Sequence, residues 1–442
     1  MSAPIELESL AFDPADARAA LDQLPASPAV FALCFDRVPM DRSSFIGQGA
    51  EAHAEPYIGS TPNLRGRLER LLVPSARHPR RLQLAGLVRE IRWRLTGSEF
   101  EALFLQYSLL ENVYGPKANE RVHLRAPAFV RFLGSNEYPR VTVTHRPSLR
   151  EAEWAYGPFQ SRAAAERYVD EALKLFLLRR CTDDLDPHPD HPGCVYSEMK
   201  MCLAPCYQGC TDKRYDEEAA AVERFLATRG ESRLVILRSE RDAASANLEF
   251  ERAAALHAQL QRVEGVRALA PELVRPLSQL RAVILQASAN AGEVAVFLYE
   301  NGRLSGPAGF STLGMRIQNE LSGSTSLFAQ PMAIEAIPEM SSSEALEAAA
   351  AKEATPPKIA RGLLEARMDT VLAALGDASE APSAAVRQGH LALVKRWYYR
   401  PEVRRSGEIF FPDEEGRWPI KALLRGVGRV AASGLKSAVS GG

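Results

Sequence analysis

The feature that most constrains this chain is a cluster of cysteines, because five of its six cysteines fall within residues 181–210. The first four, Cys181, Cys194, Cys202 and Cys206, follow the spacing C-x12-C-x7-C-x3-C. Clustered thiolates are soft ligands that bind zinc or an iron–sulfur cluster. Structural zinc sites usually use two short cysteine pairs, whereas only Cys202 and Cys206 form such a pair here. The spacing favours metal or redox chemistry.

The loop between the first two cysteines offers other donors. It contains His188 and His191 among prolines and aspartates, so it does not fit a regular helix or strand. Either histidine is an alternative ligand, although exposed loop histidines are more often only solvated. Cys210, the fifth cysteine of the cluster, has no assigned partner.

The bulk composition is that of an ordinary globular protein, with 46% hydrophobic and 25% charged residues in 442. No apolar run approaches the ~20 residues that a membrane helix needs. Residues 1–22 are acidic and lack the basic and apolar regions of a signal peptide. We therefore expect a cytoplasmic protein that does not enter a membrane. Disulfides are rare in that compartment, which again favours metal binding by the cysteines.

The net charge of −1 carries no global signature of nucleic-acid binding, but the local balance differs. Residues 57–94 contain nine arginines, two glutamates and no lysine. Such a stretch suits a phosphate backbone, and arginine favours bidentate phosphate contacts. The alternative is a solvated helix face. The candidate DNA-binding residues are Arg65, Arg67, Arg70, Arg80 and Arg81.

Two segments, one inside this arginine-rich stretch and one shortly after it, carry a family resemblance. Residues 57–68 read YIGSTPNLRGRL, and residues 98–106 read SEFEALFLQ and begin with Ser98, a candidate N-cap. They resemble the second half of the GIY-YIG nuclease signature and the helix that carries its metal ligand. The resemblance implies a small α/β module that hydrolyses phosphodiesters with one metal held by a glutamate. It further implies tyrosines and a lysine that activate water, and an arginine that stabilises the developing charge.

The nuclease positions carry over only in part. Three match the family: Tyr57, Arg67 and Asn119. Four have changed, with a phenylalanine and a leucine for tyrosines, a serine for the lysine and a glutamine for the metal glutamate. These are Phe31, Leu71, Ser60 and Gln106.

The change at Gln106 bears most directly on metal binding. A neutral amide binds a divalent cation far more weakly than a carboxylate. The helix neighbours three and four residues away are Ala102, Leu103, Leu109 and Leu110, and none is acidic. We therefore expect a vestigial site, and Mg²⁺ or Mn²⁺ as cofactor only if the site is active.

The cysteine segment resembles a second family. Residues 201–206 read MCLAPC, preceded by FLLRRC at 176–181 and YGPF at 156–159. These segments resemble the four-cysteine region of the UvrC family. The resemblance implies that Cys181, Cys194, Cys202 and Cys206 hold a [4Fe-4S] cluster, with zinc as the alternative.

Residues 239–257 resemble a UVR motif, the helical hairpin through which UvrC meets UvrB. The specific part is Leu248, Phe250, Ala253 and Ala254 with the glutamates between them. The resemblance implies partner binding through these four residues, with Phe250 as the buried anchor of the contact. The alternative is an ordinary alanine-rich hairpin.

Beyond residue 268 the sequence predicts strands over 281–286, 294–299 and 303–310, with a hairpin turn at 300–302. A linker is expected near 341–357 and a helix over 361–375. Residues 390–400 resemble a helix that precedes the second nuclease half of UvrC. We expect no room for the RNase H-like and helix–hairpin–helix domains that follow it in that family.

These segments predict an α/β (α+β) chain with a GIY-YIG-like mixed sheet, a cysteine segment, a UVR hairpin and a C-terminal α/β region. The expected divisions are 1–25, 26–125 (nuclease-like), 126–180 (connecting strands and helix), 181–210 (cysteines), 211–268 (UVR) and 269–442.

The interpretation is a UvrC-like factor in nucleotide excision repair of damaged duplex DNA. It would bind DNA and UvrB with a degenerate nuclease site. One alternative is an active UvrC- or Cho-like endonuclease that makes the 3′ incision. The other is a competitor for UvrB that regulates repair. The sequence does not indicate an oligomeric state.

Overall fold

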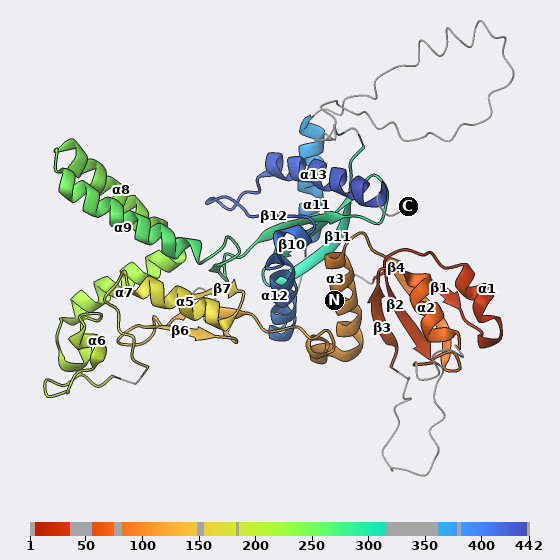
Figure 1. Ribbon diagram of the computed structural model, residues 1–442, viewed down its shortest axis with the longest axis horizontal. Coiled ribbons are helices and arrows are strands. Elements are labelled where there is room, and N and C mark those ends of the chain that lie inside the picture. The colour runs from red at the N-terminus through yellow and green to blue at the C-terminus, as the bar shows by residue number, and fades with distance from the viewer. Residues whose placement is uncertain are drawn as a thin grey trace, which may run out of the picture.

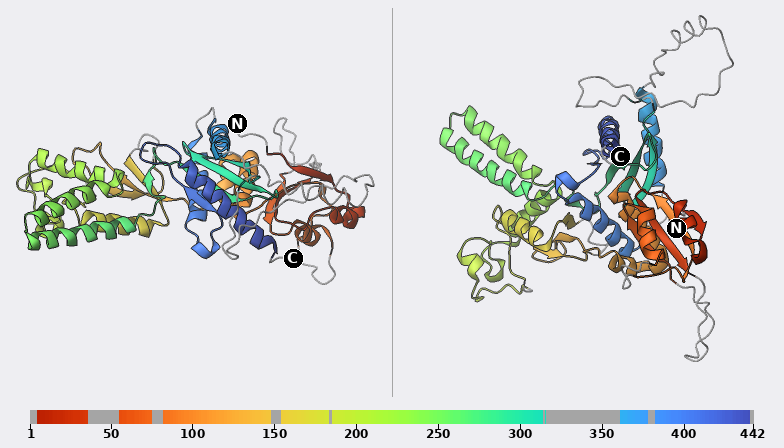
Figure 2. Two further views of the ribbon diagram at one scale, coloured as in Figure 1. Left: turned by 90° about the horizontal axis from the view of Figure 1, so that it is seen from above. Right: turned by 45° about the vertical axis from the view of Figure 1, so that its right-hand side comes forward.

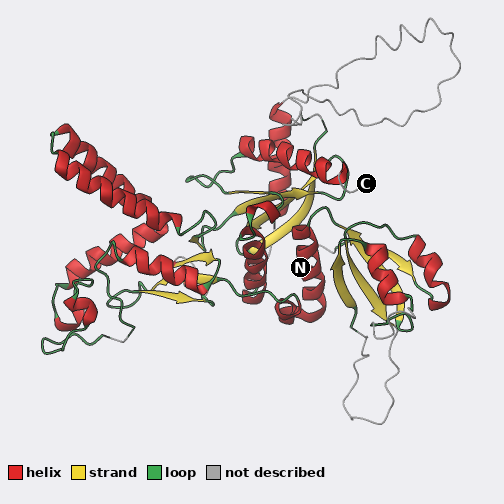
Figure 3. Ribbon diagram, viewed as in Figure 1, coloured by secondary structure: helices red, strands yellow, loops and turns green. Residues whose placement is uncertain are grey.

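The computed structural model describes residues 5–35, 55–74, 82–147, 154–182, 185–313, 315, 361–377 and 382–439. Three four-stranded sheets, all built from antiparallel pairs, organise these residues (Figures 1 and 3). Helices surround the sheets, so the expected α/β class is confirmed.

The first sheet belongs to the N-terminal part. Its strands, in order, are β1 (Glu8–Ala11), β4 (Val88–Leu95), β2 (Ala29–Phe35) and β3 (Tyr57–Thr61). Helices α1 (Ala17–Asp22) and α2 (Leu64–Leu72) accompany it. The Asn63 side chain caps α2 by accepting the N–H of Gly66, and the buried leucines at 64, 68, 71 and 72 lie on one helical face. They pack with β2 and β4 in one core.

Helix α3 (Glu99–Tyr114) follows this sheet and is capped as the sequence predicts, with Ser98 Oγ accepting the N–H of Glu101. The carboxylate of Glu101 accepts the N–H of Gly97 at 2.8 Å. A single turn, α4 (Ala118–Arg121), continues the chain.

The middle sheet leads to the cysteines and the hairpin. Its strands are β6 (Val141–Thr144), β5 (Ala128–Phe132), β7 (Ala155–Phe159) and β8 (Arg275–Pro276). Its helices are α5 (Arg162–Leu173), α6 (Val195–Glu198), α7 (Asp212–Ala227), α8 (Glu231–Ala246) and α9 (Phe250–Ala268). Helices α8 and α9 form an antiparallel arm that projects from the body (Figures 1 and 2). Because β8 comes after this arm, its pairing with β7 returns the chain to the sheet.

The third sheet is C-terminal. Its strands are β11 (Arg303–Ser311), β10 (Glu293–Glu300), β9 (Ala282–Ala287) and β12 (Glu408–Phe410). Its helices are α11 (Arg361–Gly376), α12 (Ala384–Tyr398) and α13 (Ile420–Val439). The expected hairpin turn is present, since Asn301 and Gly302 have positive φ between the paired residues Glu300 and Arg303. The expected linker at 341–357 lies outside the described residues.

Alternation along β9 explains how helices cover both faces of this sheet. Val283 and Leu285 share a core with α11 and α13, whereas Ala282 and Ile284 share a core with α3 and α12. Successive strand residues point to opposite faces, so an almost uninterrupted apolar strand serves both layers. Helix α3 therefore joins the N-terminal part to the C-terminal sheet.

His390 of α12 is buried between α3 and the C-terminal sheet. It is 5% exposed, and its Nδ1 accepts the N–H of Leu304 at 3.0 Å. Its Nε2 lies 4.0 Å from the Glu111 carboxylate, and the rings of Phe104 and Tyr107 pack beside it. Burial, with a smaller contribution from the Arg303 charge, lowers the pKa of His390 to about 3.

Because His390 is buried in its neutral form, we expect the stability of the folded chain to decrease at acidic pH. The unfolded chain protonates His390 below pH ~6.5, whereas the folded chain resists protonation until about pH 3. The free energy of unfolding should fall with decreasing pH in that window, with a slope from this group approaching about 1.4 kcal/mol per pH unit. Chemical denaturation from about pH 7 to about pH 5 of wild type and His390→Gln tests this. The variant should show a flatter dependence, and superimposable slopes would contradict the assignment.

Candidate functional site

The matched nuclease positions Tyr57 and Arg67 meet on one face of the N-terminal sheet. Tyr57 lies on β3 and Arg67 on α2, and Arg67 Nη2 donates to the Tyr57 hydroxyl at 3.3 Å. Both side chains are half-buried. A guanidinium held by a phenol is a suitable element for contacting a phosphate oxygen.

Two of the substituted positions also meet. Ser60, at the end of β3, donates its hydroxyl to Gln106 Oε1 on α3 at 2.9 Å. The positions expected to carry a lysine and a metal-binding glutamate thus hold two neutral side chains that hydrogen-bond to each other. This pair offers neither a carboxylate for a divalent cation nor a cation for water activation.

The two pairs lie on opposite faces of the sheet. Tyr57 packs against the core shared with α2, while the next residue, Ile58, packs against the core that contains α3. Ser60 contacts α3 as well. The alternation of β3 therefore separates Tyr57 and Arg67 from Ser60 and Gln106.

The two positions that have lost a tyrosine hydroxyl are core residues. Phe31 is 1% exposed and Leu71 is 4% exposed, both within the core of β2, β4 and α2. A Cβ placed on Gly59 would lie only 3.0 Å from Phe31 Cζ, so the ring fills the space above that glycine. These side chains contribute packing and have no group that can transfer a proton.

Asn119 faces the C-terminal region. A Cβ on Gly389 of α12 would lie 2.7 Å from Asn119 Oδ1, and this oxygen is buried with no hydrogen-bond partner among the described residues. Asn119 therefore lies against α12, which packs next to α4 at this point. The sequence analysis missed this contact, and Gly389, directly before the helical segment 390–400, is the signal that could have found it.

The candidate DNA-binding arginines differ in their surroundings. Arg65 donates to the carbonyl oxygens of Leu24 and Asp22 at 2.8 and 3.0 Å, so it fastens the end of α1. Arg70 is exposed, and its Nε donates to the carbonyl of Gly66. Arg80 and Arg81 lie outside the described residues.

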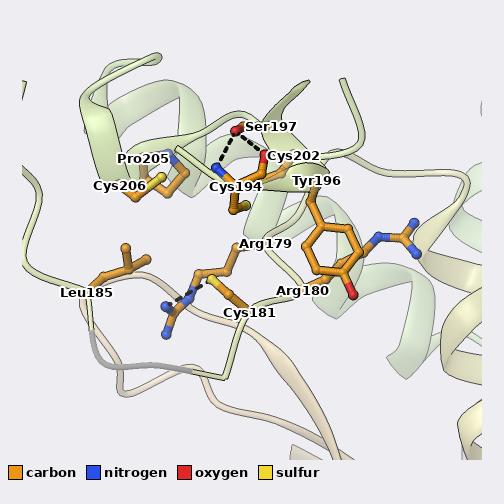
Figure 4. Close-up of a pocket in the computed structure, with 10 residues that line it drawn as sticks. All are labelled: Arg179, Arg180, Cys181, Leu185, Cys194, Tyr196, Ser197, Cys202, Pro205 and Cys206. Carbon is orange, nitrogen blue, oxygen red and sulfur yellow. Dashed lines mark hydrogen bonds between the residues drawn. The ribbon is translucent and has the colours of Figure 1, made fainter. Parts of the chain in front are cut away.

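The four predicted cysteine ligands line one pocket. Figure 4 shows Cys181, Cys194, Cys202 and Cys206 around it, together with Arg179 and Arg180. Cys194 precedes α6, Cys202 lies in the loop that follows this helix, and Cys206 lies within the single turn Pro205–Tyr207. Cys210, His188 and His191 are not among the residues lining this pocket.

Backbone donors and burial act in opposite directions on these thiols. Burial raises the pKa of Cys202 to about 11, against a hydrogen bond from the N–H of Ala204 to its Sγ at 3.3 Å. Burial also raises the pKa of Cys206, against a backbone hydrogen bond from Tyr207. The thiols of Cys202 and Cys206 are therefore protonated at neutral pH until a metal displaces their protons.

The donor chemistry fits a metal centre, since four sulfurs and no carboxylate line the pocket. As the side chains stand, however, no group of three or more histidines, cysteines or acids in the described ranges is arranged to hold a metal. Ligation therefore needs the cysteine side chains to turn toward a common centre.

The UVR-like segment is the arm formed by α8 and α9. Leu248, in the turn with φ of 61°, is 71% exposed, and Phe250 at the start of α9 is 66% exposed. Ala254 is exposed as well, whereas Ala253 packs into the hairpin core. Three of the four predicted partner-binding residues thus present apolar surface at the tip of a polar arm.

Exposure of Phe250 predicts that it contributes little to folding. Phe250→Ala should change the free energy of unfolding by less than about 0.5 kcal/mol. Leu260→Ala, at a 4% exposed position of the same helix, should cost about 2–5 kcal/mol. Equilibrium denaturation compares the two variants, and a large loss for Phe250→Ala would show that the ring packs within the chain.

The chain is similar to UvrC proteins over part of its length. Residues 129–225 match the family described as UvrC/Cho excinuclease, middle domain, and this range contains all four pocket cysteines. The UvrABC system protein C of Alcanivorax borkumensis is 30% identical over 211 residues, covering 48% of this chain and 34% of that protein. Its counterpart in Desulforudis audaxviator is 33% identical over 252 residues, covering 57% and 40%. No solved structure gave a significant match.

The fold and these matches define a relative of the excinuclease C proteins over about half of the chain. The resemblance to the UvrC family stated from the sequence is thereby confirmed for that half. The chain spans only about two-fifths or less of the length of these relatives. Within the described ranges, no helix is long and apolar enough to cross a membrane.

Proposed function

We propose that the protein acts in nucleotide excision repair in the cytoplasm as a UvrC-like factor that binds damaged duplex DNA and UvrB without cutting. The proposal rests on the confirmed UvrC relationship together with the state of the nuclease positions. The observation that best supports a protein that does not cut DNA is the hydrogen bond between Ser60 and Gln106.

This hydrogen bond bears on catalysis because of where it lies. One-metal phosphodiester hydrolysis needs a carboxylate that holds the ion and a nearby group that orients water. Both positions are occupied here by neutral partners that satisfy each other at 2.9 Å. The buried Phe31 and Leu71 remove two further hydroxyls. Restoring one group alone therefore leaves the other requirements unmet.

DNA binding does not need the lost groups. Arg67 with Tyr57, and the exposed Arg70 one turn later on α2, present positive charge at the surface of the N-terminal sheet. Phosphate contacts of this kind supply affinity that is independent of sequence and falls with salt. Arg65 is better assigned to structure, because its guanidinium donates to the carbonyl of Asp22 at the end of α1 and to that of Leu24 just beyond it.

UvrB docking is assigned to the tip of the α8–α9 arm. Leu248 and Phe250 are large apolar side chains that the chain leaves in solvent. An exposed aromatic on a preformed helical hairpin is a typical anchor of a protein–protein contact. The arm projects far enough from the body to approach a partner (Figure 2).

The cysteine pocket is assigned to a [4Fe-4S] cluster held by Cys181, Cys194, Cys202 and Cys206. Such a cluster would supply a rigid, negatively charged cross-link between the segment after α5 and the turn before α7. This chain's own contribution is the set of four thiols and the N–H groups of Ala204 and Tyr207 that donate to sulfur. Zinc is the alternative, and determination of iron, sulfide and zinc in purified protein separates the two.

The test of the proposal is incision of a defined lesion-bearing duplex in the presence of UvrA, UvrB, ATP and Mg²⁺. The wild type should bind the UvrB–DNA complex and leave both strands intact. Gln106→Glu alone should also be inactive, because Phe31, Ser60 and Leu71 remain unchanged. Nicking by the wild type that disappears with a chelator would contradict the proposal and favour the endonuclease alternative.

The docking assignment has its own test. Phe250→Ala should weaken UvrB binding by about thirtyfold, which corresponds to the loss of about 2 kcal/mol at a hot spot. Val235→Ala, at a 57% exposed apolar position on α8, is the matched control and should bind like wild type. Calorimetry or fluorescence anisotropy measures both. Equal affinities for wild type and Phe250→Ala would remove the arm from the interface.

A further inference from the structure

A buried cation stands beside the first cysteine of the pocket. Arg179 is 3% exposed, and its Nη1 donates to Cys181 Sγ at 3.7 Å. Figure 4 shows the guanidinium directed at this sulfur. The pocket therefore contains a charged donor at one cysteine as well as backbone donors at two others.

The surroundings hold the Arg179 guanidinium in this place. Its Nε donates to the carbonyl of Tyr138 at 3.1 Å. The backbone N–H of Arg179 donates to the Tyr215 hydroxyl, which in turn donates to the carbonyl of Pro139 at 2.8 Å. These bonds tie the arginine to the loop between β5 and β6 and to α7. The guanidinium is thus held beside the pocket by bonds that do not involve the cysteines.

The neighbouring arginine provides a contrast within the same pocket. Arg180 also lines it, but its guanidinium lies 6.0 Å from the centroid of the Tyr196 ring and extends away from Cys181 (Figure 4). Arg179 and Arg180 therefore differ in the direction of the guanidinium: that of Arg179 points at Cys181, and that of Arg180 points away from it.

We propose that Arg179 is a positioning residue that sets the reduction potential of the metal centre at the four cysteines. The inference rests on the iron–sulfur assignment made under the proposed function. A cluster held by four thiolates carries net negative charge, and one-electron reduction adds to it. A buried cation and an N–H donor at a ligating sulfur stabilise the reduced form more than the oxidised form. Arg179 thereby raises the potential.

The experiment compares wild type, Arg179→Gln, Arg179→Lys and Arg180→Gln as full-length proteins loaded with iron and sulfide. A redox titration followed by electron paramagnetic resonance gives the midpoint potential of each. Arg179→Gln should shift the ratio of reduced to oxidised cluster at a given potential by about tenfold toward the oxidised form, which is ~59 mV for one electron. Arg179→Lys should shift less, because it keeps the charge. Arg180→Gln should match the wild type.

The outcomes of these titrations distinguish the role of Arg179 from the assignment of the cluster. Equal potentials for Arg179→Gln and Arg180→Gln in loaded, folded proteins would overturn the role of Arg179 while leaving the cluster assignment intact. If Arg179→Gln fails to retain the cluster, retention by Arg179→Lys supports the requirement for charge, whereas loss in both overturns it in favour of a purely structural role. Wild-type protein that contains zinc, or no metal, would overturn the cluster assignment and this inference together.

Discussion

The structure depends on the burial of one helix, α3, between two sheets. Phe100 packs edge-on against Phe297 of β10 at 5.1 Å and against Trp397 of α12 at 5.3 Å. The core that contains these rings also includes Val30 of β2. A Cβ on Gly97 would clash with the backbone of Ala287 and Ser288, so the two parts approach as closely as main chains allow. The N-terminal sheet and the C-terminal sheet therefore share one core. The helix between them, α3, is also the one that carries Gln106.

This shared core shows which of the nuclease-like positions contribute to packing. The positions that stabilise the module are the packing positions, and they remain apolar, as Phe31 and Leu71 show. Ser60 and Gln106 form a neutral hydrogen-bonded pair, which costs the fold little because each satisfies the other. The arm and the cysteine pocket lie in another part of the chain, around the middle sheet.

Much of the local structure could be predicted from the sequence. Ser98 caps α3, the turn at Asn301 and Gly302 joins two antiparallel strands, and the segment predicted as a helical hairpin, 239–257, lies within the longer hairpin of α8 and α9. Such features depend on neighbours in sequence. The surroundings of Arg65, Asn119 and Arg179 could not be predicted from neighbouring residues. The side chains of Arg65 and Arg179 each donate to a carbonyl 41 residues away, and Asn119 lies against Gly389 of α12.

The sequence by itself determined the resemblance to the UvrC family, the spacing of the four cysteines and the presence of a neutral amide at Gln106, because these depend only on residue identity and order. Only the tertiary structure decided which groups meet. It joined Ser60 to Gln106, placed Tyr57 and Arg67 on the opposite face, buried His390 against α3 and directed Arg179 rather than Arg180 at Cys181. The physical reason is that distance, burial and direction, which set the strength of charges and hydrogen bonds, arise only when segments remote in sequence pack together.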